Sequence, residues 1–198
     1  MPVRSITFLV MVLAGLALAC EGNHPQPIAP SALQSGSANV GSGAPLPVGT
    51  ASAAAHAITL FDACDPATFN AAIGPGACVR SGGVTFQNFV EQLRSHHSAG
   101  AWHFAPVQVT MRAGQMLEAN NRGGEAHTFT EVEEFGGGTV PFLNNLVGLT
   151  EMAPECSGAV MIPSGGSSSE TEDEPGVEKY QCCIHPWMRA EVRVIQKQ

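Results

Sequence analysis

A short segment near the C-terminus carries three side chains that bind soft metal ions. Cys182, His185 and Met188 lie close together between two expected strands. A thiolate and an imidazole are strong ligands for copper, and a thioether adds a soft, weak contact. One tight loop can hold all three donors around one ion without distant elements having to meet. The residue types and their spacing therefore indicate a site for a single copper ion.

A cysteine-containing trigonal plane around copper needs a second imidazole, which must come from an adjacent strand. His127 is well placed, because it stands near the start of the alternating segment 126–132, which predicts a strand. We therefore expect His127 to join Cys182 and His185 in one site.

Together, the two segments resemble the ligand segments of cupredoxins, the small type 1 copper proteins, and most closely the amicyanin, pseudoazurin and plastocyanin-like branch. The downstream half fits the amicyanin-like pattern of Cys, two residues, His, two residues and Met, with Pro186 and Trp187 between the last two ligands. The upstream half shows Phe104-Ala105-Pro106, a turn at Gly114, and an Asn121-Arg122-Gly123 loop that leads to His127-Thr128-Phe129. The resemblance covers about residues 102–195.

The resemblance implies one type 1 copper per chain and a one-electron carrier. His127, Cys182 and His185 would form the equatorial plane, and Met188 would be the long axial ligand. Pro186 and Trp187, with part of 140–143, would form an apolar docking patch for a redox protein partner such as a cytochrome or an oxidoreductase.

Three other functions are alternatives to electron transfer. One is a periplasmic copper carrier or storage protein that delivers copper rather than electrons. Catalysis is not expected, because copper enzymes on this fold generally add a second metal site with further histidines. A thiol redox centre at Cys182 and Cys183 ranks last, because it leaves His127, His185 and Met188 without a shared purpose.

The six cysteines divide between these roles. The ligand set implied by the resemblance uses Cys182, and a lipid anchor would use Cys20. Four cysteines remain, which allow three disulfide pairings in an oxidising compartment. We prefer Cys64–Cys78, which closes a short loop, and Cys156–Cys183, which would tie the apolar insertion 135–156 to the copper loop.

The N-terminus has the features of an export signal. Arg4 precedes an apolar run over 6–18, which is shorter than the roughly 20 residues that span a bilayer. Cleavage after Ala19 would leave Cys20 first, as in bacterial lipoproteins, although an ordinary signal peptidase could also cut there. We expect residues 1–19 to be a signal peptide and the mature protein to be lipid-anchored in the bacterial cell envelope or periplasm, with no other membrane contact.

Composition separates a tether from the folded part. Residues 20–57 are rich in Pro, Ser, Gly and Ala, so they cannot bury enough apolar surface to offset their ordering entropy, which predicts a flexible linker. We expect a cysteine-containing extension over 58–101, with one helix over 85–95, and a copper domain over 102–198.

Short alternating segments separated by turns dominate the second half and predict an all-β protein. The expected strands are 107–111, 116–120, 126–132, 159–162, 177–182 and 191–195, with an acidic loop before 177. The expected fold is a Greek-key β-sandwich, cupredoxin-like, with a short helix-containing N-terminal extension. With 9 basic against 17 acidic residues, the chain is not expected to bind nucleic acid.

Overall fold

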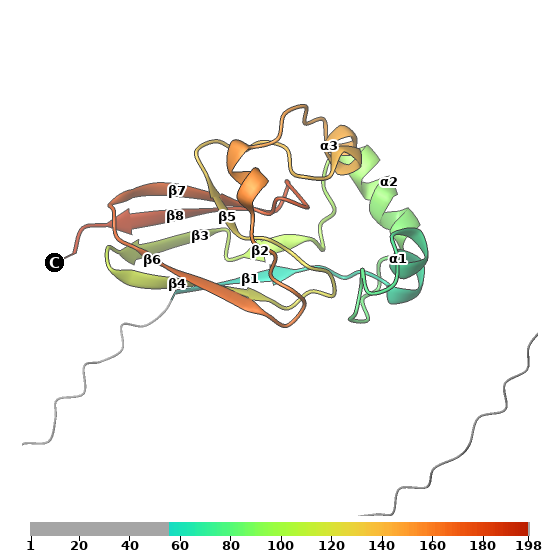
Figure 1. Ribbon diagram of the computed structural model, residues 1–198, viewed down its shortest axis with the longest axis horizontal. Helices are drawn as coiled ribbons and strands as arrows, with labels where there is room; N and C mark the ends of the chain where they lie inside the picture. Colours follow the sequence, from blue (N-terminus) through green and yellow to red (C-terminus); the bar gives the residue numbers. More distant parts are fainter. Residues whose placement is uncertain (1–55, 198) are drawn as a thin grey trace, which may run out of the picture. The chain divides into compact units, whose positions relative to one another are not determined.

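The computed structural model describes residues 56–197, in which two four-stranded β-sheets pack face to face (Figure 1). The first sheet has the order β2-β1-β4-β6 and consists of β1 (His56–Phe61), β2 (His103–Ala105), β4 (Gln115–Asn121) and β6 (Ser167–Glu172). The second has the order β3-β8-β7-β5 and consists of β3 (Gln108–Arg112), β8 (Arg189–Ile195), β7 (Gly176–Gln181) and β5 (Thr130–Val132). The predicted β-sandwich is therefore confirmed.

Alternation along the strands builds the core between the sheets. Ile58 and Leu60 of β1 are buried, and so are Val192 and Val194 of β8, while the residues between them are more exposed. Successive side chains of a strand point to opposite faces, so each strand contributes every second residue to the core. Both sheets are mixed, because β1 runs parallel to β4 and β3 runs parallel to β8.

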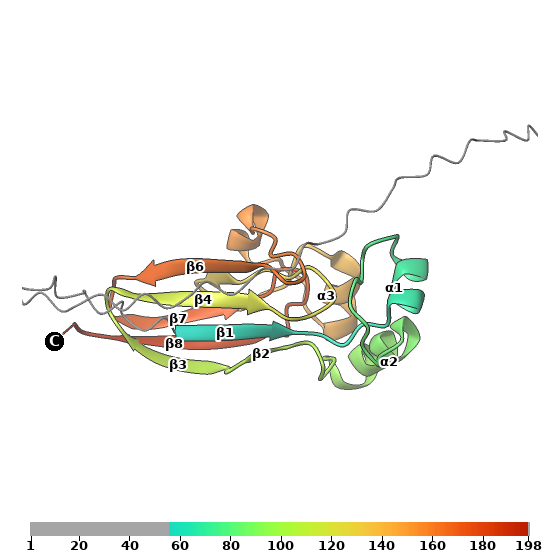
Figure 2. The same ribbon diagram turned by 90° about the horizontal axis from the view of Figure 1, so that it is seen from below.

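Three helices gather at one end of the sandwich (Figures 1 and 2). They are α1 (Pro66–Ala72), α2 (Phe86–His96) and α3 (Pro141–Val147). The helix expected over 85–95 is α2; the hydroxyl of Thr85 caps it by accepting from the Asn88 N–H. Its buried stripe packs on α1, where the rings of Phe69 and Phe89 are 5.4 Å apart. Within residues 56–197, no helix combines the length and apolar content needed to cross a membrane.

The N-terminal extension contributes a strand to the sandwich. β1 pairs with both β2 and β4, and it starts at His56, two residues inside the expected linker. The extension also holds two helices rather than one. The signal for α1 was missed because only Phe69 of this seven-residue helix is buried, which leaves no periodic stripe. The expected signal peptide, Cys20 and nearly all of the linker lie outside the described residues.

Two expectations about the second half are also corrected. Residues 159–162, expected as a strand, contribute only an isolated bridge between Ile162 and His127. The acidic segment expected as a loop instead contains β6, which pairs with β4 along its whole length. Serines and acidic residues rarely indicate a strand. β6 nevertheless forms an edge strand, because it pairs with β4. The insertion 135–156 contains α3 and the start of a 3₁₀ turn over Pro154–Gly158.

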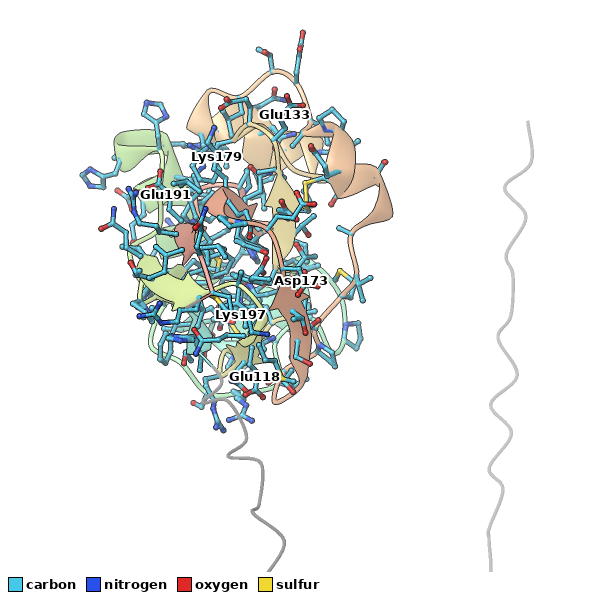
Figure 3. All side chains as sticks on the ribbon, turned by 90° about the vertical axis from the view of Figure 1, so that its left-hand side faces the viewer. Glu118, Glu133, Asp173, Lys179, Glu191 and Lys197 are labelled. Carbon is cyan, nitrogen blue, oxygen red and sulfur yellow. A yellow bond between two sulfur atoms is a disulfide. The ribbon has the colours of Figure 1, made fainter. Side chains whose placement is uncertain are left out.

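Acidic side chains cluster on β5, β6 and β7. The buried carboxylate of Glu172 accepts a 2.6 Å hydrogen bond from the Tyr180 hydroxyl. Glu178 lies beside it: burial raises the pKa of Glu178, and its hydrogen bond with Glu172 together with nearby negative charge brings that pKa to about 8. Asp173 directly follows β6. Figure 3 shows it from the end of the sandwich opposite the helices.

This cluster predicts a pH-dependent stability. A carboxyl group whose pKa is raised on folding stabilises the folded state below its unfolded pKa, and this contribution is lost as the pH rises through the folded pKa. The free energy of unfolding should therefore fall between about pH 5 and pH 8, and Glu178→Gln should flatten this slope. Urea unfolding at a series of pH values checks this; equal slopes for the variant and the wild type would contradict it.

Candidate metal centre

The loop between β7 and β8 folds back on itself and buries its donors. The Cys182 N–H donates to the Met188 carbonyl at 3.0 Å, and the Met188 N–H donates to the His185 carbonyl at 2.9 Å. The exposed fractions are 0 % for Cys182, 2 % for His185 and 1 % for Met188. The antiparallel pair β7 and β8 fixes both ends of the loop, so the loop presents these side chains in one arrangement.

His127 reaches the same place from the other half of the chain. It lies just before β5, and its backbone exchanges two hydrogen bonds with Ile162, at 3.1 and 2.7 Å. Its imidazole is fully buried. The next residue, Thr128, ties the two segments together: its N–H donates to the Cys182 sulfur at 3.4 Å, and its hydroxyl accepts from the Cys183 N–H at 2.7 Å.

Three donor atoms converge in this pocket of the core. The Cys182 Sγ lies 3.8 Å from the Nδ1 of His127 and 3.8 Å from the Nδ1 of His185, and the two nitrogens are 3.3 Å apart. The centre of that triangle is about 2.1 Å from each donor, which matches the metal–nitrogen and metal–sulfur bond lengths of first-row ions. One thiolate and two imidazoles in a near-trigonal arrangement are the donor set of a type 1 copper site, so these residues fit copper.

The surroundings favour the thiolate form of Cys182. Burial alone would raise the pKa of this thiol, but its contacts with His127 and His185 lower it well below its usual value. Because the thiolate is the form that binds metal, this lowered pKa favours metal binding by Cys182.

A buried carboxylate contacts the His127 ring on the side away from Cys182. The imidazole Nε2 lies 2.9 Å from an oxygen of Asp62, just after β1. Burial raises the pKa of Asp62, but the hydrogen bond with His127 and those from two backbone N–H groups outweigh it and lower the pKa to about 2. Burial lowers the pKa of His127, whereas its contacts with Asp62 and Cys182 raise it, to about 9.

A second carboxylate lies near the His185 ring on the side away from Cys182. The Oε2 of Glu125 lies 3.7 Å from the His185 Nε2, and it accepts a 2.7 Å hydrogen bond from the indole N–H of Trp102. The sequence analysis missed both Asp62 and Glu125. Asp62 had a detectable signal, because it continues the period-two alternation of Ile58 and Leu60 onto the buried face. Asp62 and Glu125 also lie near the Cys64 sulfur, but a disulfide already occupies that atom.

The other cysteines within residues 56–197 are paired. Cys64 is bonded to Cys78, and Cys156 is bonded to Cys183, which are the two pairs that the sequence analysis preferred. The Cys183 sulfur is therefore occupied, and Cys182 is the free cysteine among the described residues.

The residues of the expected docking patch differ in exposure. Pro186 is buried and Trp187 is partly buried, because the helices cover this end of the sandwich, whereas Phe142 is exposed. The Trp187 ring packs 5.9 Å from Phe89 and 5.4 Å from His185. An almost entirely apolar cavity of about 350 Å³ opens beside them, and His185 and Glu125 are among its lining residues. Its lining also includes the exposed side chains of Ile73, Phe142 and Met161.

No family model matches the sequence, and neither does any curated protein. Among solved structures, a methionine-to-alanine variant of amicyanin in its Cu(I) state is 20 % identical over 47 % of this chain and 73 % of that chain, with a TM-score of 0.33. A purple cupredoxin from Nitrosopumilus maritimus is 19 % identical over 49 % and 86 % of the two chains, with a TM-score of 0.36. Amicyanin from Paracoccus versutus is 19 % identical over 47 % and 73 %, with a TM-score of 0.32. We therefore base the functional proposal on the geometry of the chain's own residues.

Proposed function

We propose that this chain is a mononuclear type 1 copper protein that carries single electrons. The observation that supports this most strongly is the convergence of one cysteine sulfur and two imidazole nitrogens, all buried, from segments 55 residues apart. His127, Cys182, His185 and Met188 would hold the ion. Bound copper supplies a one-electron couple between Cu(II) and Cu(I).

The protein's part in this function is to keep the donors still. Thr128 ties the His127 segment to Cys182 and Cys183, and the backbone of the Cys182–Met188 loop is closed by its own hydrogen bonds. Packed surroundings resist rearrangement, so the donors keep nearly the same positions in both oxidation states. A small rearrangement keeps the barrier to electron transfer low.

Electron transfer is preferred over copper delivery because the donors are inaccessible. All four proposed ligands are at most 2 % exposed, whereas a delivery protein must hand its ion directly to an acceptor. Catalysis is not proposed, since among residues 56–197 the histidines group at this one site only.

The cellular setting proposed here is the bacterial envelope. Two disulfides suit an oxidising compartment, and the leader and Cys20 would supply export and a lipid anchor. A redox protein would approach the helix-covered end, where Phe142 and Met161 are exposed beside the cavity next to His185.

The test is to add one equivalent of Cu(II) to the mature protein and record its visible spectrum and its voltammogram. An intense thiolate-to-copper band with reversible one-electron electrochemistry is expected. Tight binding of Cu(I) alone, with rapid transfer to a chelator, would instead identify a copper carrier. The absence of the band at full copper occupancy would overturn the proposed type 1 centre.

A further inference from the structure

Both candidate histidine ligands face the sulfur with Nδ1 and a buried carboxylate with Nε2. His127 contacts Asp62 at 2.9 Å, and His185 lies 3.7 Å from Glu125. An Nε2–H that donates to a carboxylate leaves the Nδ1 lone pair free for a metal. Both carboxylates thus face the Nε2 side of a ring, Asp62 at hydrogen-bond distance from His127 and Glu125 at ion-pair distance from His185.

We propose that Asp62 and Glu125 are positioning residues of the copper centre, which fix the two imidazoles and lower the reduction potential of the bound ion. This inference rests on the proposed function, because it assigns a role at that same site. It also makes the N-terminal segment, which the resemblance to cupredoxins does not cover, a working part of the centre.

Asp62 is held in one orientation. One carboxylate oxygen accepts from the N–H groups of Gly124 and Cys64, at 2.9 and 3.2 Å, and the other accepts from the Glu125 N–H at 3.0 Å as well as contacting His127. Gly123 must be glycine here, since a Cβ at that position would lie 1.9 Å from the Asp62 carboxylate. This many contacts leave the carboxylate no second position, so it can fix the imidazole of His127.

Glu125 is held by an aromatic cluster. Within the described residues, the Glu125 side chain accepts one hydrogen bond, from the Trp102 indole at 2.7 Å, and the Trp102 ring packs 4.5 Å from the ring of Phe89. Glu125 is 7 % exposed, so little water screens it from the site. Asp62 follows β1, and Phe89 lies in α2, so the extension provides one carboxylate and packs against the indole that holds the other.

A buried negative charge near a metal site acts on the two oxidation states unequally. It stabilises Cu(II) more than Cu(I), because its attraction grows with the charge of the ion. Removing either charge should therefore raise the reduction potential. The effect of Asp62 should be the larger, because its contact with the ligand is closer.

The test compares Asp62→Asn and Glu125→Gln, both of which keep the side-chain shape and an acceptor oxygen. The matched controls are Asp173→Asn and Glu118→Gln, whose side chains lie on strands or turns away from the site (Figure 3). At a fixed solution potential, Asp62→Asn should lower the Cu(II)/Cu(I) ratio at least ten-fold, equivalent to 59 mV for one electron. Glu125→Gln should lower the ratio by a smaller factor, and the controls should leave it unchanged.

A merely structural role predicts a different result. In that case the potential would stay at the wild-type value in both variants while the visible band persisted, and this outcome would overturn the inference. A wild-type protein that takes up copper without the band would instead count against the proposed function, so the two failures are distinguishable.

If Asp62→Asn does not fold, nitrogen-15 NMR of the wild-type Cu(I) protein still decides the role of Asp62. The Nε2–H of His127 should exchange slowly with solvent. A freely exchanging Nε2–H would contradict the role given to Asp62, whereas a His127 protonated on Nδ1 would contradict its role as a ligand and so the proposed function.

Discussion

Replacing Cys182 by serine should abolish the intense visible absorption of the copper-loaded protein and lower its copper affinity by more than about 100-fold. The reason is that the Cys182 sulfur is the one thiolate within reach of both imidazole nitrogens, and a hydroxyl is a far poorer ligand for copper. Visible spectroscopy during a copper titration, with a competing chelator, measures both effects.

The matched control is the double variant Cys156→Ser/Cys183→Ser. It removes the neighbouring cysteine and its disulfide partner together, so no unpaired thiol is left behind. This variant should retain the band. Loss of the band in the control, with the band retained in Cys182→Ser, would show that the ligand is Cys183 and that the assignment is wrong.

The same double variant should lose much of its stability. The disulfide closes a loop with a sequence separation of 27, and removing such a crosslink costs about 3 to 4 kcal/mol through the entropy of the unfolded chain. For a domain of this size, the loss should lower the melting temperature by about 10 °C. Calorimetry of the metal-free protein, compared with wild type under identical conditions, measures the change.

The melting temperature of this double variant also shows whether the Cys156–Cys183 disulfide holds the insertion against the Cys182–Met188 loop. Cys183 is buried against Val132 and Cys156, so the crosslink holds the insertion against the start of the copper loop. An unchanged melting temperature would mean that the contacts of this small cluster hold the insertion without the crosslink.

The three candidate donors of the loop could be proposed from the sequence because their signal is local. Cys182, His185 and Met188 follow one another in a single loop, and their spacing carries the chemistry before any folding is considered. The strands around them were also predictable, since β4 and β8 alternate cleanly between buried and exposed residues. His127 could be paired with that loop because a trigonal copper plane needs a second imidazole and the alternating segment 126–132 places His127 near the start of a strand.

The carboxylates behind the histidines were not predictable in the same way. Asp62 is 65 residues from His127, and Glu125 is 23 residues from the indole that holds it. Acidic residues in loops are usually solvated, so the alternation that includes Asp62 is a weak signal on its own, and the sequence carries no such signal for Glu125. The buried Pro186 illustrates the same limit, because helices from distant parts of the chain decide what the loop exposes.

β1 and β6 were missed for a related reason. β1 is one short strand next to a linker of low complexity, and β6 is made largely of serine and glutamate. Both are strands because β4 pairs with each of them, one on either side. Strand propensity depends strongly on such partners, which lie far away in the sequence.

X-ray absorption at the copper edge tests the central claim most directly, because it identifies the atoms bound to the metal. With one equivalent of copper in the mature protein, the first shell should contain one short copper–sulfur bond and two nitrogen atoms, with the multiple scattering typical of imidazole. A first shell of nitrogen and oxygen alone, or one with two short sulfur bonds, would contradict the convergence of Cys182, His127 and His185 on one ion.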